Sequence, residues 1–276
     1  DYIQEPVFYD DGHTMSFGNK IIAKNVFSVI SPIYFGKTYS VTLSSHTEKN
    51  ESGAGVVYAV GSDLSNRNFD NLNLQNAIFD KADLSNTSFK NTNIDGARFV
   101  FANLSNSNLL DRTDLSNVNL AGTDLSNVSL KGTNLSSAIL TGTDLTGVIL
   151  TGSDLTGTML ARANLTGAIL KDVDLSGKDL SYTVLKDVDL SGKDLSGTNF
   201  FFTDLRSSDL SGTILSDSIL FRTNLSKIDL RTAKLDNVDF RYAILSESKL
   251  PDSLLVNNNF DYATLTNINF AGKDLS

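Results

Sequence analysis

Two groups of residues in this sequence could take part in chemistry, namely two histidines near the N-terminus and the serines and aspartates that recur through the rest of the chain. A serine nucleophile needs a base within hydrogen-bonding distance, but His13 and His46 both lie outside the region of recurring serines. The chain contains no cysteine, which excludes a disulfide framework, a thiolate metal site and a cysteine nucleophile. We therefore predict no catalytic residues, no cofactor and no enzymatic activity.

The regular aspartates leave a second chemical hypothesis open. Asp124 and Asp144 lie 20 positions apart, as do Asp154 and Asp174, and carboxylates stacked about 5 Å apart would attract an oxygen-seeking cation. The alternative is that these carboxylates are solvated and accept hydrogen bonds from the backbone of nearby turns. No calcium-loop spacing occurs in the sequence. We favour the second interpretation and predict no metal site.

The charge of the chain narrows the classes of partner. Its formal net charge is -9, which disfavours nucleic acid and anionic membranes because phosphate contacts need clustered lysine and arginine. No apolar stretch approaches the roughly 18 residues of a membrane span, and no signal-peptide pattern is present. The chain begins at Asp1 rather than Met, which we interpret as a mature form after removal of a leader. An extracellular or cell-surface location is expected, with the cytoplasm as the alternative.

A strict period of five organises most of the chain. From Leu64 to Leu109 a large apolar residue occurs at every fifth position, one residue is then inserted near 110–111, and the series resumes at Leu115 and continues to Leu275. All of these central residues are Leu, Phe or Ile, and the residue two positions before each of them is mostly small. A period of five matches neither a helix nor an ordinary strand. The backbone must therefore turn inward once in each pentad.

These pentads resemble a known repeat. Units such as 163–167 (Ala-Asn-Leu-Thr-Gly) and 143–147 (Thr-Asp-Leu-Thr-Gly) are similar to the A(D/N)LXX unit of the pentapeptide-repeat family, and the match covers about three quarters of the chain. The resemblance implies a right-handed quadrilateral β-helix with four pentads per coil, in which the central residue and the small residue two positions before it point inward. Members of the family have unrelated roles, so the resemblance predicts the fold and not the function.

Four pentads per coil would place residues 20 positions apart on top of one another. Once the insertion near 110–111 is treated as a bulge, the phenylalanine centres all fall on two opposite faces. We therefore predict an all-β protein with a small β-rich N-terminal cap or domain in residues 1–60 and a right-handed quadrilateral parallel β-helix of about 11 coils in residues 61–276. The predicted core ladder contains Phe69, Phe79, Phe89, Phe99, Leu145, Phe200, Phe240 and Phe260.

Three lysines break the pattern of small inward residues. Lys178, Lys193 and Lys273 occupy the position two before a centre, where a buried, unpaired ammonium would destabilise the fold by several kcal/mol. We expect each side chain to extend past the adjacent glycine or to pair with a neighbouring aspartate.

The strongest candidate for a functional site lies two residues after the centres of one face. Tyrosine, phenylalanine and arginine follow one another there at 20-residue steps. Such residues anchor interfaces, and arginine over a ring adds a cation–π attraction. We predict an outward stripe across six coils that binds a partner, the alternative being that the stacked side chains only stabilise the coils. The predicted partner-binding residues are Arg162, Tyr182, Phe202, Arg222, Tyr242, Tyr262, Phe201 and Phe221.

The function predicted from these features is a non-enzymatic structural protein whose rods associate with copies of themselves, end to end or laterally, in a surface filament or layer. The C-terminal coil near Phe270 and Leu275 is the expected assembly end, because an open β-helix end exposes backbone donors and acceptors. One alternative is a module that binds another protein or a glycan through the stripe. A second is a DNA-mimicking topoisomerase inhibitor, although about 50 Å of DNA carries around 30 charges, far more than a net charge of -9.

Overall fold

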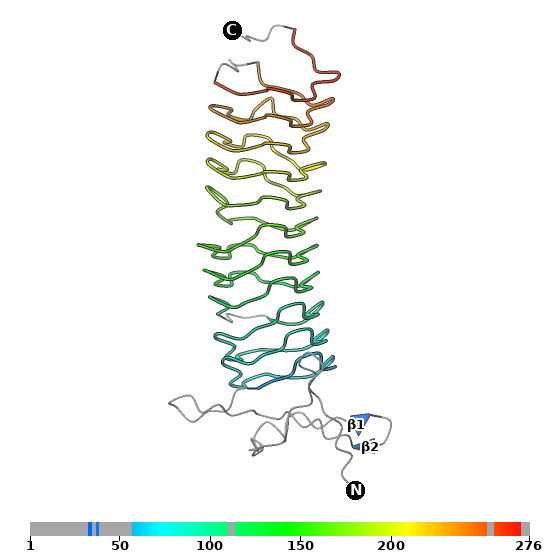
Figure 1. The fold of residues 1–276 in the computed structure, drawn as a ribbon. Coiled ribbons are helices and arrows are strands. Elements are labelled where there is room, and N and C mark those ends of the chain that lie inside the picture. Colours follow the sequence, from blue (N-terminus) through cyan, green and yellow to red (C-terminus); the bar gives the residue numbers. More distant parts are fainter. Residues whose placement is uncertain (1–32, 35–36, 39–56, 110–113, 253–256, 272–276) are drawn as a thin grey trace.

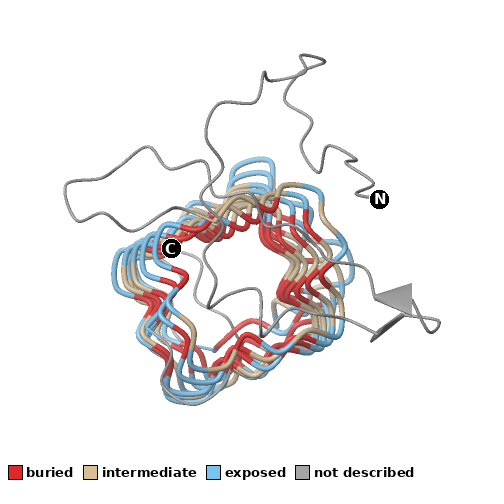
Figure 2. Ribbon diagram, turned by 90° about the horizontal axis from the view of Figure 1, so that it is seen from below, coloured by how far each residue is buried: buried red, intermediate tan, exposed pale blue. Residues whose placement is uncertain are grey.

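Most of the described residues form one stack of coils (Figure 1). The computed structural model describes residues 33–34, 37–38, 57–109, 114–252 and 257–271. Seen along the axis of the stack, each coil has four sides, with buried residues facing inward and exposed residues concentrated at the outside (Figure 2). The predicted right-handed quadrilateral parallel β-helix is confirmed.

Two short strands lie before the coils in the sequence. Strand β1 (Ile33–Tyr34) pairs antiparallel with β2 (Lys37–Thr38). The remaining residues up to 56 lie outside the described part of the chain, as do His13 and His46. The N-terminal cap or domain over residues 1–60 therefore stays a prediction.

Parallel β-bridges join each coil to the next at a spacing of 20 residues, as between Asp63 and Asp83. Around the expected insertion the spacing becomes 21, since Arg98 pairs with Asn119. The columns of side chains therefore continue across this point, while residues 110–113 themselves lie outside the described part.

Tight turns close most corners of the described coils. The amide of the residue three positions after a centre donates to that centre's carbonyl, as from Ala163 to Leu160 at 3.0 Å. The residue between them, two after the centre, has a positive φ, as at Asn66 with 59°. Glycine adopts this conformation without strain and asparagine with little. Many pentads therefore end in one of these two residue types.

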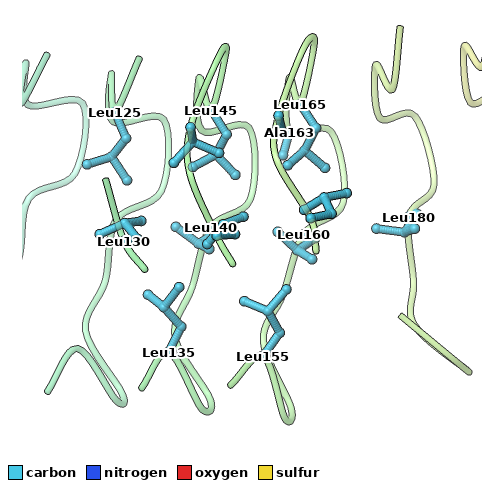
Figure 3. Close-up of a cluster of buried hydrophobic side chains, with 14 of the residues drawn as sticks. Leu125, Leu130, Leu135, Leu140, Leu145, Leu155, Leu160, Ala163, Leu165 and Leu180 are labelled. Carbon is cyan, nitrogen blue, oxygen red and sulfur yellow. The ribbon is translucent and has the colours of Figure 1, made fainter. Parts of the chain in front are cut away.

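The centres fill the inside of the coils. Figure 3 shows Leu125, Leu145 and Leu165 in one column and Leu140, Leu160 and Leu180 in another, all directed into the core. Each has at most 2% of its surface exposed. Because every coil adds the same inward side chains to the same columns, the core extends along the whole stack.

Phenylalanine centres stack in two columns. The ring centroids of Phe69 and Phe89 are 4.9 Å apart, and those of Phe79 and Phe99 are 5.2 Å apart. Phe69 meets Phe79 edge to face across the core at 6.1 Å, which places the two columns on opposite sides of it. In the C-terminal coils Phe240 stacks on Phe260 at 4.7 Å. Phe200 and Phe240 are fully buried, whereas Phe260 is only partly buried.

Where the inward residue two before a centre is polar, its side chain in most cases donates a hydrogen bond to a backbone carbonyl of the core. The hydroxyl of Thr143 donates to the carbonyl of Leu120 at 2.8 Å. Lys178 makes the equivalent bond, with Nζ 2.9 Å from the carbonyl oxygen of Leu155. From the sequence, this side chain was expected to extend past the adjacent glycine or to pair with a neighbouring aspartate. In the structure its ammonium group instead donates to a backbone carbonyl of the preceding coil. Lys273 lies outside the described residues.

Candidate binding surface

One corner of the helix carries large side chains in a column. We define the corner ridge as the residues two after the centre on one face of six consecutive coils. All six have φ between 56° and 65°, a region in which a residue with a Cβ is strained. Coil-to-coil hydrogen bonds hold the ridge backbone in register, for example from the amide of Tyr182 to the carbonyl of Phe201 at 2.7 Å. The ridge consists of Arg162, Tyr182, Phe202, Arg222, Tyr242 and Tyr262.

The ridge side chains stack continuously from coil to coil. The Arg162 guanidinium lies 4.8 Å from the ring centroid of Tyr182, and the rings of Tyr182 and Phe202 are 5.4 Å apart with 6° between their planes. Arg222 follows, between Phe202 at 5.1 Å and Tyr242 at 5.3 Å. Tyr242 then stacks on Tyr262 at 4.8 Å.

A second row, at the preceding position of the turn in three consecutive coils, supports the ridge and consists of Phe201, Phe221 and Arg241. The rings of Phe201 and Phe221 are 5.4 Å apart and nearly parallel, at 20°. Phe201 meets Phe202 edge to face at 4.9 Å, and Arg241 lies 5.4 Å from the Phe221 ring. The two rows together form a packed aromatic layer on the outside of the helix.

The ridge remains open to solvent despite this packing. Between 41% and 44% of the surface of Tyr182, Phe202 and Tyr242 is exposed, and 77% of that of Tyr262. Because neighbours in the stack take up both faces of the Tyr182, Phe202 and Tyr242 rings, the edges of these rings and the hydroxyl groups are what a partner would meet. Edge-presented aromatics bind best inside an apolar recess, where the edges are desolvated.

Two aspartates beside the ridge are paired with arginines of their own turns. Nη2 of Arg241 lies 2.8 Å from Oδ2 of Asp239, and this bond lowers the pKa of the Asp239 carboxyl below its ordinary value. Arg206 forms the same pair with Asp204 at 2.7 Å. No ion pair joins Arg222 to any residue in the described ranges.

The ridge has an N-terminal counterpart that counting along the sequence missed. Phe101, 65% exposed and with φ 58°, lies at the same corner. Its ring leans over Gly122, so that a Cβ added there would lie 2.4 Å from the ring. A Cβ added to Gly142, one coil further, would meet nothing within 4 Å. Counting in steps of 20 from the ridge fails here because the insertion adds one residue between Phe101 and Gly122.

The aspartates before the centres are occupied by the turns. Oδ1 of Asp174 accepts hydrogen bonds from the amide of Ser176 at 2.9 Å and from its hydroxyl at 2.7 Å, and these bonds lower the pKa of the Asp174 carboxyl. Asp63 is bound in the same way by Ser65, with the same effect on its pKa. Within the described ranges no three His, Asp or Glu side chains are grouped so that they could hold a metal ion.

The expected assembly end is described only in part. Phe270 is partly buried against the core, and Leu275 lies outside the described residues. A contact between rods through this end therefore stays a prediction. In the described part of the chain no helix has the length and apolar character to cross a membrane.

The family of the chain follows from its repeats. The model of the family "Pentapeptide repeats" matches in eight copies, over residues 60–96, 79–111, 109–147, 138–177, 179–217, 220–252 and 233–272. The chain belongs to the pentapeptide-repeat family. No curated protein sequence matches the chain.

Several solved structures are similar to it. One is HetL, a pentapeptide repeat protein involved in heterocyst differentiation regulation from the cyanobacterium Nostoc sp. strain PCC 7120, with 27% identity over 78% of this chain and 89% of HetL and a TM-score of 0.40. Another is full-length QnrB1, a plasmid-mediated fluoroquinolone resistance protein, with 16% identity over 77% and 94% and a TM-score of 0.26. Rfr23 from the cyanobacterium Cyanothece 51142 has 26% identity over 47% and 91% and a TM-score of 0.22. TM-scores this low give these similarities no bearing on function.

Proposed function

We propose that this chain is a non-enzymatic protein-binding module that inserts its corner ridge into a recess of another protein. The observation that carries the proposal is the composition of the ridge. Six successive left-handed turn positions hold Arg, Tyr or Phe, whereas asparagine and glycine hold most of the equivalent positions elsewhere, as at Asn127 and Gly147. A residue with a Cβ in this conformation is disfavoured by about 1–2 kcal/mol, so large exposed side chains at six such positions need an explanation beyond turn formation.

The residue types of the ridge support binding. Tyrosine and arginine dominate the energetic centres of protein interfaces. Side chains that are stacked in the free protein lose little further freedom when a partner covers them, which favours affinity. Stacking between ridge residues also stabilises the coils, so both roles are compatible with one arrangement.

The shape of the ridge favours a different protein over a second copy of the chain. The ridge residues occupy turn positions, and the turns form the corners of the four-sided coil (Figure 2), where the surface is convex. Two convex corners meet along a line and bury little surface, whereas stable interfaces bury about 1,200–2,000 Å². The self-assembling filament or layer predicted from the sequence, and its surface location, have no support from the described residues or from similar proteins.

The DNA-mimicking alternative has less support than protein binding. The column that contains Asp144 also contains the neutral residues Asn164 and Val184, so its negative charge is interrupted. The arginines Arg162 and Arg222 on the adjacent corner would further weaken an imitation of DNA. A glycan is disfavoured as the ligand because sugars bind to ring faces, and those of Tyr182, Phe202 and Tyr242 are covered by stacked rings and guanidinium groups.

A site-specific cross-linker tests the proposal. We would place a photoreactive phenylalanine analogue at position 202 and, in a separate protein, at Asn127, which has the same backbone conformation and is exposed at another corner. Irradiation in an extract of the source cells should give a discrete adduct from position 202 that disappears when Tyr182 and Tyr242 are changed to Asn. An adduct with the chain itself would instead support lateral self-association. Equal labelling from both positions, or none from position 202, would rule out the ridge as the binding surface.

A further inference from the structure

The two arginines of the ridge indicate which side chains its partner must carry. We infer that the ridge receives an extended acidic segment of a partner protein, with two carboxylates that bind Arg162 and Arg222 and apolar side chains between them. This inference rests on the proposed binding role of the ridge and goes beyond it by specifying the partner.

The first step is the contrast between these arginines and others in the chain. The guanidinium groups of four described arginines are bound by an aspartate within the protein, in the pairs Arg98–Asp80, Arg206–Asp204, Arg231–Asp229 and Arg241–Asp239. Arg162 and Arg222 have rings as neighbours instead, and among the described residues neither has a carboxylate partner. Their charge is thus left uncompensated at the surface.

The second step is the geometry around Arg222. Phe202 and Tyr242 lie on either side of its guanidinium at 5.1 and 5.3 Å, and Phe221 lies at 5.7 Å. Rings attract the cation through their faces, but they do not take up the five N–H donors of a guanidinium. The side chain is therefore held in place while its hydrogen-bonding capacity stays available.

The third step is what burial of the ridge would require. A guanidinium that loses water without gaining acceptors destabilises a complex by several kcal/mol. A recess that covers the ridge must therefore supply acceptors at both arginines. A carboxylate matches the planar fork of donors with two parallel hydrogen bonds, so acidic side chains are the acceptors that fit best.

The spacing of the arginines sets the spacing of the carboxylates. Arg162 and Arg222 are 60 residues apart in sequence, which is three coils, or about 14–15 Å along the axis. An extended chain covers about 13–14 Å in four residues. Two glutamates separated by three residues therefore reach both arginines, and the middle one of the three side chains between them, which points to the same side of the extended chain, lies against the edges of Tyr182 and Phe202.

The net charge of the chain does not contradict this assignment. Of the aspartates next to the ridge, Asp204 and Asp239 are already paired with arginine, and Asp179 accepts hydrogen bonds from the Ser181 amide and the Asn199 side chain. Single-stranded nucleic acid also carries anions, but it binds aromatic residues by stacking bases on ring faces. The Tyr182 and Phe202 rings are nearly parallel to each other at 6°, so the faces between them are not available to a base.

Binding of a synthetic peptide tests the inference. The probe is a fluorescent, end-blocked peptide with the sequence Glu-Leu-Phe-Leu-Glu, compared with peptides in which both Glu are replaced by Gln or are separated by one residue. The substitutions Arg162→Asn and Arg222→Asn remove the guanidinium and keep a residue type that tolerates the turn. Lys227→Asn is the matched control, because Lys227 has the same positive φ and lies on another corner. Affinity is measured by fluorescence anisotropy with the intact chain.

We expect each arginine substitution to weaken binding of the Glu peptide about tenfold, which corresponds to roughly 1.4 kcal/mol. The Gln peptide should bind the parent protein as weakly as the Glu peptide binds the double variant, and Lys227→Asn should change nothing. The inference is overturned if the peptide does not bind at millimolar concentration, if the Gln peptide binds equally well, or if a ten-residue oligothymidylate binds more tightly. Another outcome is that a partner is cross-linked at position 202 equally well with and without both arginine substitutions. That result would support the binding role of the ridge and contradict only the inference that the partner segment is acidic.

Discussion

The guanidinium carbon of Arg222 lies 5.1 Å from the centroid of the Phe202 ring. The two residues are 20 positions apart in sequence and occupy the same corner of consecutive coils. Their contact exists only because the helix repeats every four pentads, and it links the stability of the stack to the surface that we propose binds a partner.

Coupling between Arg222 and Phe202 should be measurable in the free protein. We expect Phe202→Asn and Arg222→Asn each to lower the free energy of unfolding by about 1 kcal/mol and the double-mutant cycle to give a coupling energy of about 0.5–1 kcal/mol. Chemical denaturation of the four proteins checks this. Additive effects would show that the stacked pair contributes nothing to the stability of the fold.

The core should be intolerant of charge at any coil. Leu145 is fully buried, and Leu145→Asp should destabilise the surrounding coils by several kcal/mol, because an unpaired carboxylate would enter an apolar column. Hydrogen exchange measured by mass spectrometry should show lost protection centred on residues 125–165. Gly132→Asp serves as the control, since Gly132 is exposed. Asp172 lies at the same corner of another coil and has a similar positive φ to Gly132, so an aspartate is tolerated there. Unchanged protection in the Leu145 variant would contradict the assigned register.

The corner conformation should discriminate between residue types. Asn86 has φ 56°, so Asn86→Val should lower the free energy of unfolding by more than about 1 kcal/mol, because a β-branched residue is strained there. Asn86→Gly should change it by only a few tenths of a kcal/mol. Thermal unfolding of the two variants separates backbone strain from the loss of the asparagine side chain. Equal effects of Val and Gly would show that strain is not what selects the residue.

Lys193 should make the stability of the fold depend on alkaline pH. Burial lowers its pKa below 10.5, although Asp172, Asp189 and Asp174 oppose this. The folded state therefore binds this proton less tightly than the unfolded state, so stability is reduced at neutral pH and recovers as the pH rises through the lowered pKa towards 10.5. Lys193→Thr should accordingly stabilise the protein at pH 7, and its advantage over the parent should shrink by pH 10. An advantage that is constant with pH would show that the charge of Lys193 is not responsible.

Acid should weaken the turns that aspartate closes. The Ser176 hydroxyl and amide lower the pKa of Asp174 below 3.8, so the stability gained from this carboxylate is complete above pH 3.8 and is lost as the pH falls through the lowered pKa. Asp174→Asn keeps an oxygen acceptor, as Asn134 does in accepting from the Ser136 amide at 3.0 Å. The variant should therefore lose less stability than the parent between pH 4 and pH 2, as followed by urea denaturation. A parallel decline in both proteins would assign the acid sensitivity to other groups.

Much of the fold follows from local features of the sequence. The period of five places an apolar side chain such as Leu145 inside, because one inward position per turn is available and burial of leucine is strongly favourable. The recurring Asn and Gly identify the corners, because only a few residue types accept a positive φ readily. The ridge could be predicted for the same reason, since residues 20 apart must share a corner once four pentads make a coil.

The contacts of polar and charged side chains could not be predicted in this way. Lys178 reaches the carbonyl of Leu155 in the preceding coil, and nothing in the pentad that contains Lys178 indicates that acceptor. Arg241 is bound by Asp239 in its own turn, whereas Arg222 is held between rings of the coils on either side. Arg241 lies one residue after its centre and two after Asp239, whereas Arg222 lies two residues after its centre, and the rings that hold Arg222 come from the neighbouring coils.

The sequence by itself thus determined the coil, its core and the corner on which the ridge lies, because these depend on a repeated pattern of burial and turn conformation that every pentad satisfies locally. Only the tertiary structure decided that the ridge rings present their edges and that Arg162 and Arg222 keep their hydrogen-bonding groups available. Those properties arise from the stacking of one coil on the next, since a flexible side chain takes the rotamer that the coils above and below it allow.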